Sequence, residues 1–289
     1  MKRAPHSQTA TLLVSCPDRK GLVAALGQLL YGHGVNILDA NQYSDLPAGQ
    51  FFQRIRIDLR ELHTDRVGLE RAIGEVAERF AMRYRLRYAE RAPRVAILVS
   101  KYDHCLQDLL WRRQAGELAC EVPLIVSNHP DLEPIAGAYG IAFHACPVVD
   151  GDRQRQEARI LELLEGHDID LVVLARYMQV LSPEFCEHYR ERAINIHHSF
   201  LPAFVGARPY HQAYERGVKI IGATAHYVTS DLDQGPIIEQ DVARVSHRDT
   251  VDDLVRKGRD LERLVLARAV RAHLEDRVLI YGNKTVVFE

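Results

Sequence analysis

An amide and an imidazole lie two residues apart in the segment NIHHSFLPAF (195–204), where an apolar run ends in polar residues. If that run is a strand, side-chain alternation places Asn195 and His197 on one face and turns His198 away from His197. Open α/β sheets bind ligands at the ends of their strands, so this pair is well placed for chemistry. The alternative is that both side chains only satisfy backbone groups at a strand end.

A second group of polar residues follows the apolar run GATAHYV (222–228). The loop TSDLDQ (229–234) is closed by Gly235 and Pro236 before another apolar run begins. Loops held by a rigid sheet often carry function, and Asp233 there can orient a histidine, favour its protonated form or position a water. Turn chemistry alone also explains an aspartate and a glycine in such a loop.

Both groups belong to a stretch, beginning after residue 90, in which continuous apolar runs alternate with helical patterns. Such runs predict a mostly parallel, Rossmann-like sheet with helices on both faces. The predicted helices span about 104–115, 131–139, 152–166 and 250–275, and the chain ends in a hairpin that turns at Gly282–Asn283.

The first ninety residues read as β-α-β-β-α-β, the order of a ferredoxin-like unit. Helical patterns run from Gly21 to His33, with Asp18 as the expected N-cap, and from about Thr64 to Met82. The polar segment AERAPR (89–94) separates two complete patterns. We therefore predict an α/β protein with two domains, residues 1–90 and 91–289.

The composition argues against several classes of partner. The 289 residues carry a formal net charge of −2, which gives no electrostatic reason to expect nucleic acid or an anionic membrane. No apolar run approaches the roughly 18 residues of a membrane helix. Five cysteines, an odd number without a C-x-x-C pair, predict reduced thiols and hence the cytoplasm.

The fourteen histidines invite a metal hypothesis. Their spacings contain no H-E-x-x-H pattern, and no cysteine pair accompanies them. We therefore expect no metal and no other cofactor.

The segment from Asn195 to Ile238 resembles the formyltransferase-fold folate enzymes, which include the glycinamide ribonucleotide transformylases and the methionyl-tRNA formyltransferases. Within that superfamily the whole chain is similar to the formyltetrahydrofolate deformylases, and its first ninety residues resemble an ACT domain. The motifs that carry the likeness are ILVSKYDHCLQDLLWR, VLARYMQVLSPEF, ARPYHQAYERG and EDRVLIYGNKTVVF.

The resemblance implies hydrolysis of 10-formyltetrahydrofolate to formate and tetrahydrofolate, a reaction that serves one-carbon and purine metabolism. Asn195, His197 and Asp233 occupy the family's catalytic positions, and the Leu201–Pro202 bond lies where its members turn sharply. The segments 175–181 and 227–232 match the folate pocket. Its expected members are Arg176, Tyr177, Met178, Val180, Leu181, Tyr227, Val228, Thr229 and Asp231.

One departure from the superfamily bears on the acceptor. Transformylases that use a ribonucleotide have a glycine-rich loop after the first strand of this domain, whose amides cradle the phosphate. The matching residues 100–105 read SKYDHC, with bulky side chains and an aspartate that repels phosphate. Lys101 and His104 can still attract an anion through their side chains. The near-neutral charge and the short region after the last predicted helix also argue against a tRNA substrate.

Three classes of function remain: a folate deformylase, a formyltransferase to a small amine, and a folate-binding regulator without catalysis. Release of formate from 10-formyltetrahydrofolate alone separates them. The ACT resemblance implies a homo-oligomer formed through ACT pairing and a small amino-acid effector, with the amides around Asp18–Gly21 as one place for a carboxylate. A role in assembly alone is the alternative.

Overall fold

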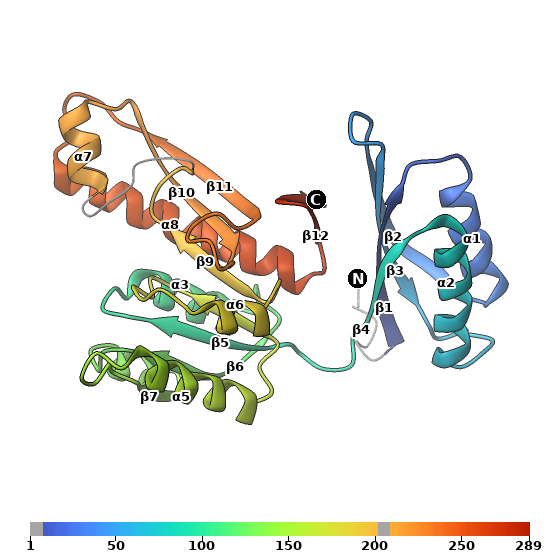
Figure 1. The fold of residues 1–289 in the computed structure, drawn as a ribbon, viewed down its shortest axis with the longest axis horizontal. Coiled ribbons are helices and arrows are strands. Elements are labelled where there is room, and N and C mark those ends of the chain that lie inside the picture. Colours follow the sequence, from blue (N-terminus) through green and yellow to red (C-terminus); the bar gives the residue numbers. More distant parts are fainter. Residues whose placement is uncertain (1–7, 202–208) are drawn as a thin grey trace. The chain divides into compact units, whose positions relative to one another are not determined.

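The computed structural model describes residues 8–201 and 209–289. The chain divides into two compact units (Figure 1). Unit 1 comprises Met1–Ala92, Asp276–Tyr281 and Val286–Glu289, and unit 2 comprises Pro93–Glu275 and Gly282–Thr285. The sequence prediction assigned all residues after 90 to the second domain, whereas this division places most of the C-terminal hairpin with the first.

Unit 1 is built on an antiparallel sheet in the order β2-β3-β1-β4. Its elements are β1 (Thr9–Pro17), α1 (Leu22–Gly32), β2 (Asn36–Asp45), β3 (Gln50–Asp58), α2 (Arg66–Phe80) and β4 (Arg83–Tyr88). This confirms the β-α-β-β-α-β order predicted from the sequence. Alternating apolar residues put one face of each central strand against the helices.

The two faces of this sheet have different cores. Residues of one face, among them Leu12 and Ile55, pack against α1 and α2. Leu13 and Phe52 on the other face pack against Phe288, in the C-terminal hairpin of β12 (Val278–Tyr281) and β13 (Lys284–Val287). The hairpin prediction is therefore confirmed, and its strands close an apolar face within unit 1.

The expected cap of the first helix is wrong. The residue that precedes α1 is Gly21, with φ of 93° and no side-chain capping bond. The backbone N–H of Asp18 instead donates to the carbonyl of Gly49. Only a residue without a side chain tolerates this left-handed conformation easily, so the turn and not an aspartate starts the helix.

Unit 2 contains a sheet in the order β11-β10-β9-β8-β5-β6-β7. Strands β5 to β9 pair in parallel, whereas β10 runs antiparallel to both of its neighbours. The strands are β5 (Arg94–Val99), β6 (Glu121–Ser127), β7 (Ala142–Ala145), β8 (Leu171–Leu174), β9 (Ala193–His197), β10 (Ile220–Tyr227) and β11 (Ile237–Arg244). The predicted α/β class with a mostly parallel sheet is confirmed.

Helices cover both faces of this sheet, which is why its parallel strands are apolar throughout. The helices are α3 (His104–Gln114), α4 (Glu133–Ala138), α5 (Arg153–Gly166), α6 (Pro183–His188), α7 (Pro209–Arg216) and α8 (Val251–Leu274). Residues of α5 and α6 pack on one face, and α8 contacts α3, β9, β10 and β11. The long helix α8 begins at a capping box formed by Thr250 and Asp253.

Two short helices, α6 and α7, were not predicted as elements, because six to eight residues carry too little periodicity. The sharp turn expected at Leu201–Pro202 includes residue 202, outside the described residues. No helix in the described part of the chain is long and apolar enough to cross a membrane.

Candidate active site

The pairing of β9 with β10 determines which side chains meet. Asn195 lies directly opposite His226, and His197 lies opposite Thr224. Cross-strand partners share a face, so one face of this pair carries an amide and two imidazoles. The Thr224 hydroxyl is buried and donates to the carbonyl of Ser199, which fixes the chain just after β9.

The loop of residues 229–236, here called the Asp233 loop, brings a carboxylate to this face. Asp233 has a left-handed backbone with φ of 56°. A Cβ added to Gly235 would lie 1.7 Å from the carbonyl oxygen of Tyr227, so only glycine lets the loop return this closely to β10. Asp233 Oδ2 then lies 3.1 Å from His197 Nδ1.

His226 lies between the amide and the carboxylate. Its Nε2 is 3.3 Å from Asn195 Nδ2 and 3.5 Å from Asp233 Oδ1. Its Nδ1 donates to the carbonyl of Tyr227, 2.9 Å away, because a carbonyl only accepts. With Nδ1 donating to this carbonyl, Nε2 accepts from the Asn195 amide when the ring is neutral and donates to Asp233 Oδ1 when the ring is protonated.

Asp233 is ionised at neutral pH. Burial alone would raise the pKa of Asp233, but hydrogen bonds from His197 and His226 outweigh it and lower the pKa far below the usual value. A carboxylate beside an imidazole favours the imidazolium and holds its ring in one orientation. The three predicted catalytic residues therefore lie together in a geometry suited to polarising a carbonyl.

The orientation expected for His198 is wrong. Its ring stacks on that of His197, with centroids 4.9 Å apart and planes inclined by 16°. Strand alternation does not apply here, because β9 ends at His197. Burial, followed by the charges of Arg176 and His197, lowers the pKa of His198 to about 4.

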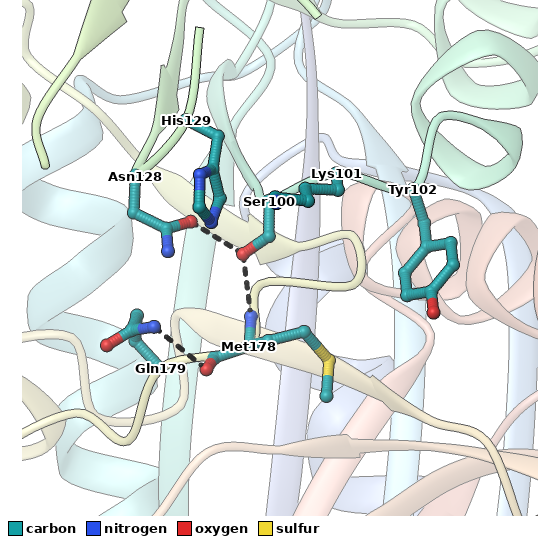
Figure 2. A pocket seen from close by; sticks show the side chains of 7 residues that line it. All are labelled: Ser100, Lys101, Tyr102, Asn128, His129, Met178 and Gln179. Carbon is teal, nitrogen blue, oxygen red and sulfur yellow. Dashed lines mark hydrogen bonds between the residues drawn. The ribbon is translucent and has the colours of Figure 1, made fainter. Parts of the chain in front are cut away.

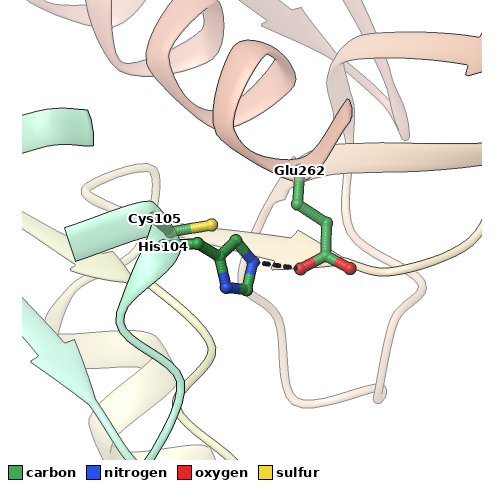
Figure 3. Close-up of side chains that lie close together, drawn as sticks. All are labelled: His104, Cys105 and Glu262. Carbon is green, nitrogen blue, oxygen red and sulfur yellow. Dashed lines mark hydrogen bonds and ion pairs between the residues drawn. The ribbon is translucent and has the colours of Figure 1, made fainter. Parts of the chain in front are cut away.

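The charges of Glu262 and Arg176 act on His198 and belong to a buried cluster. Figure 3 shows two of its members, His104 and Glu262. Glu262 Oε2 is 2.7 Å from His104 Nε2 and 3.5 Å from Arg176 Nε, and Glu262 Oε1 accepts from the Tyr210 hydroxyl. Burial would raise the pKa of Glu262, but its hydrogen bond from His104 and the charge of Arg176 lower it.

His104, Cys105 and Glu262 together offer three atoms of the kind that bind metals. The donor set does not fit a cation, because the Arg176 guanidinium already lies beside the same carboxylate oxygen. Burial also raises the pKa of the Cys105 thiol well above its usual value, which opposes the thiolate a metal requires. We therefore interpret the group as an internal ion-pair cluster.

A cavity of about 270 Å³ opens where β5 and β6 end (Figure 2). Ser100 Oγ donates to Asn128 Oδ1 and accepts from the backbone N–H of Met178, which ties the two strand ends to the segment after β8. The residues that line the cavity are Ser100, Lys101, Tyr102, Asn128, His129, Met178 and Gln179.

The expected folate-pocket residues of segment 175–181 have different surroundings. Met178 lines the cavity and is 54% exposed. Arg176 has a left-handed backbone and lies between Glu262 and the ring of Tyr102. Tyr177 is buried in the core that α5 and α6 form with the sheet, and Leu181 packs against that core. Val180 is exposed.

The second expected folate segment combines buried and exposed positions. Tyr227 is buried and hydrogen-bonded to His273, and Val228 packs against the core. The Thr229 hydroxyl donates to the carbonyl of Asp231, whose side chain is exposed. Together they shape the Asp233 loop and its approach to β9.

Sequence reasoning missed two residues around the site: His226 and Glu262. His226 stands on the strand before the Asp233 loop, and alternation along that strand would have put it on one face with Thr224. Its opposition to Asn195 depends on the register between β9 and β10. Glu262 reads as an ordinary polar residue of an amphipathic helix, so nothing local marks it.

Comparisons with known proteins agree with this architecture. The formyl transferase family model matches residues 93–270, and the ACT domain model matches residues 10–79. The formyltetrahydrofolate deformylase of Synechocystis sp. is 56% identical over 97% of this chain and 98% of its own length. The deformylase of Bacillus subtilis is 51% identical over 99% and 96%.

Solved structures give the same result. The formyltetrahydrofolate deformylase of Pseudomonas syringae superposes with a TM-score of 0.93 at 49% identity, covering 98% of this chain and 95% of that one. Glycinamide ribonucleotide transformylase 1 of Symbiobacterium toebii superposes with a TM-score of 0.64 at 34% identity, covering 68% of this chain and 95% of that one. The likeness to the deformylases spans both units, and the chain therefore belongs to the formyltetrahydrofolate deformylase family.

Proposed function

We propose that Asn195, His197 and Asp233 are the catalytic residues of a deformylase. As a member of this family, the chain is a hydrolase that converts 10-formyltetrahydrofolate and water to formate and tetrahydrofolate. The observation that supports the assignment most directly is the 3.1 Å contact of His197 Nδ1 with Asp233 Oδ2, on the face that also carries Asn195.

The reaction begins with attack of water on the formyl carbon. The carbonyl oxygen becomes an oxyanion, which accepts hydrogen bonds from the Asn195 amide and from Nε2–H of protonated His197. Asp233 binds the Nδ1 side of His197, so it favours the imidazolium and directs the opposite nitrogen toward substrate. Asp233 also accepts the proton that the attacking water releases.

Collapse of the oxyanion breaks the bond between the formyl carbon and N10. N10 must gain a proton to leave, and His197 supplies it. Proton transfer from Asp233 to His197 then restores both groups, leaving formate and tetrahydrofolate. The sequence of steps is nucleophilic substitution at a carbonyl and changes no oxidation state, so the proposed mechanism involves no cofactor.

We infer that water is the acceptor, because segment 100–105 has bulky side chains where a phosphate cradle needs bare backbone amides. In segment 100–105 no residue has a left-handed backbone, and the Tyr102 ring lies 5.0 Å from the Arg176 guanidinium carbon. His104 of this segment and Arg176 are both paired with Glu262. These contacts favour hydrolysis over transfer to a phosphorylated amine.

We also propose that substrate extends from the Asp233 loop toward the cavity next to Met178. The pteridine would contact the segment 227–232, and the rest of the folate would follow segment 175–181. Lys101 and His129 line the cavity and carry no acidic partner among the described residues, which suits the carboxylate end of a folate.

Incubation of the purified chain with 10-formyltetrahydrofolate alone, with formate and tetrahydrofolate measured, tests the activity. His197→Ala and Asn195→Ala each remove an oxyanion donor and should lower kcat at least about a hundredfold. Thermal melting checks that both variants fold. Near-normal hydrolysis in both would refute the assignment of roles, and turnover that requires an added amine would favour a formyltransferase.

Unit 1 supports a proposal of assembly and regulation through its ACT domain. Strand β2 is an edge strand and exposes Ile37, Leu38 and Tyr43, each by 38–49%, a surface suited to pairing with a second copy. A small amino acid can bind near the amides at the start of α1. Native mass spectrometry of the full chain and a thermal-shift screen of amino acids test these two proposals.

The cytoplasm is the compartment that we propose. All five cysteines are free thiols, and none is paired with another. Reduced thiols of this kind persist in a reducing compartment. Four of the five thiols are buried, so the protein is alkylated in denaturant directly after cell lysis, and mass spectrometry should find all five cysteines modified.

A further inference from the structure

The stack of His198 on His197 has a consequence for the hydrolysis. We propose that His198 is a positioning residue, whose ring supports that of His197 in the orientation that reaches both Asp233 and the formyl oxygen. The inference rests on the catalytic role proposed for His197. It is carried by the parallel arrangement of the two rings, whose centroids are 4.9 Å apart.

A second aromatic ring lies beyond His198. The Tyr210 ring is 6.3 Å from the His198 ring and inclined by 46°. Tyr210 itself is fixed, because its hydroxyl donates to Glu262 Oε1 at 2.7 Å. Helix α8 also crowds it, since a Cβ added to Gly258 would lie 2.0 Å from that hydroxyl oxygen. His198 therefore has a second aromatic neighbour, which is itself held in place.

The charges around the pair let only one ring carry a proton. Burial, the charge of Arg176 and that of His197 lower the pKa of His198 to about 4, so His198 is neutral near pH 7. A neutral aromatic face attracts a neighbouring cation, whereas a second imidazolium would repel it. The neutral ring thus supports the His197 ring and places no second charge beside it.

Other titratable and charged groups surround the pair from five segments of the chain, and their pairing is consistent with this interpretation. Asp233 interacts directly with His197, while the charge of Glu262 is balanced by Arg176. The groups that contribute are Asp233 from its loop, His226 from β10, Arg176 after β8, His104 from α3 and Glu262 from α8. Asp233 therefore contacts His197 directly and acts on His198 through its charge.

Two substitutions of similar volume separate the ring face from the ring nitrogens. His198→Phe keeps a flat ring and should retain kcat within about threefold. His198→Leu fills the space without a flat face and should lower kcat roughly three- to thirtyfold with KM unchanged. His247→Leu is the matched control, because His247 is exposed in the segment after β11 and should leave both constants unchanged. Thermal melting is measured for every variant.

Full activity of His198→Leu would overturn the proposal, and so would a His198→Phe enzyme as slow as His198→Leu, since the nitrogens would then matter. His197→Ala is assayed beside them: if it stays active, the proposed function itself fails. A measurement on the unmodified protein covers the case in which the variants do not fold. The ¹³Cε1 resonance of His198 should not titrate between about pH 5.5 and 8, and a titration in that range would contradict a neutral stacked ring.

Discussion

Gly235 sets the position of the Asp233 loop, and replacing it with alanine should move the catalytic carboxylate. The added Cβ would lie 1.7 Å from the Tyr227 carbonyl oxygen, whereas Cβ atoms essentially never come closer than 3.0 Å, so the loop must retreat by at least about 1.3 Å. Asp233 is two residues away and contacts His197 at 3.1 Å. A displacement of about 1 Å at a catalytic group typically costs about a hundredfold in rate.

Formate release by Gly235→Ala, measured over a range of 10-formyltetrahydrofolate concentrations, gives kcat and KM. We expect kcat to fall about a hundredfold, while circular dichroism shows a folded protein. Gly137→Ala in α4 is the control, because its added Cβ would meet no atom within 4 Å, and its activity should be unchanged. Normal turnover by a folded Gly235→Ala would refute the claim that packing against β10 positions Asp233.

Three further substitutions test the surroundings of the site. His226→Phe removes the ring nitrogen that lies between Asn195 and Asp233. We expect kcat for formate release to fall about tenfold at unchanged melting temperature. Unchanged turnover would show that His226 has no role in the reaction. Glu262→Gln breaks a buried ion pair and should lower the free energy of unfolding by about 3–5 kcal/mol, as measured by urea unfolding at pH 7. The pKa of Glu262 in the folded state lies below 4.5, so the stabilisation from its charge is complete above pH 4.5 and is lost as the pH falls through the folded-state pKa. The free energies of unfolding of the wild type and the variant should therefore converge in acid. A difference that stays constant with pH would contradict this. His198→Phe should flatten the pH dependence of the free energy of unfolding between pH 6.5 and about 4. The wild type loses at most about 3 kcal/mol there, because its folded state resists protonation of His198. If wild type and variant show the same pH dependence, the pKa of His198 is not lowered in the folded protein.

Much of the fold follows from local patterns, because the relevant forces act over a few residues. Apolar runs such as LVVL (171–174) predict buried parallel strands, and Thr250 with Asp253 marks the start of α8. The same-face placement of Asn195 and His197 also follows from alternation within β9. The start of α1 does not follow, since a glycine turn with φ of 93° replaces the side-chain cap that an aspartate suggests.

The parts of the site that escaped prediction all depend on long-range geometry. His226 faces Asn195 because of a strand register that no local pattern encodes. His198 stacks on His197 because β9 ends there, and the residue at which a strand ends is decided by its neighbours in the sheet. Glu262 is buried because His104 and Arg176, which are 86 residues or more away along the chain, reach its carboxylate.

The two carboxylates near the site have separate partners, and that separation is what makes one histidine fit for catalysis. Glu262 contacts His104, Arg176 and Tyr210, so its negative charge is compensated within the cluster. Asp233 is left to the face that carries His197, and its lowered pKa keeps it ionised there. The neutral ring of His198 stands between the two groups and adds no competing charge. An imidazole that contacts an ionised carboxylate and stacks on a neutral neighbour can gain and release a proton without rearranging the charges around it, which is what an oxyanion donor that later protonates N10 must do.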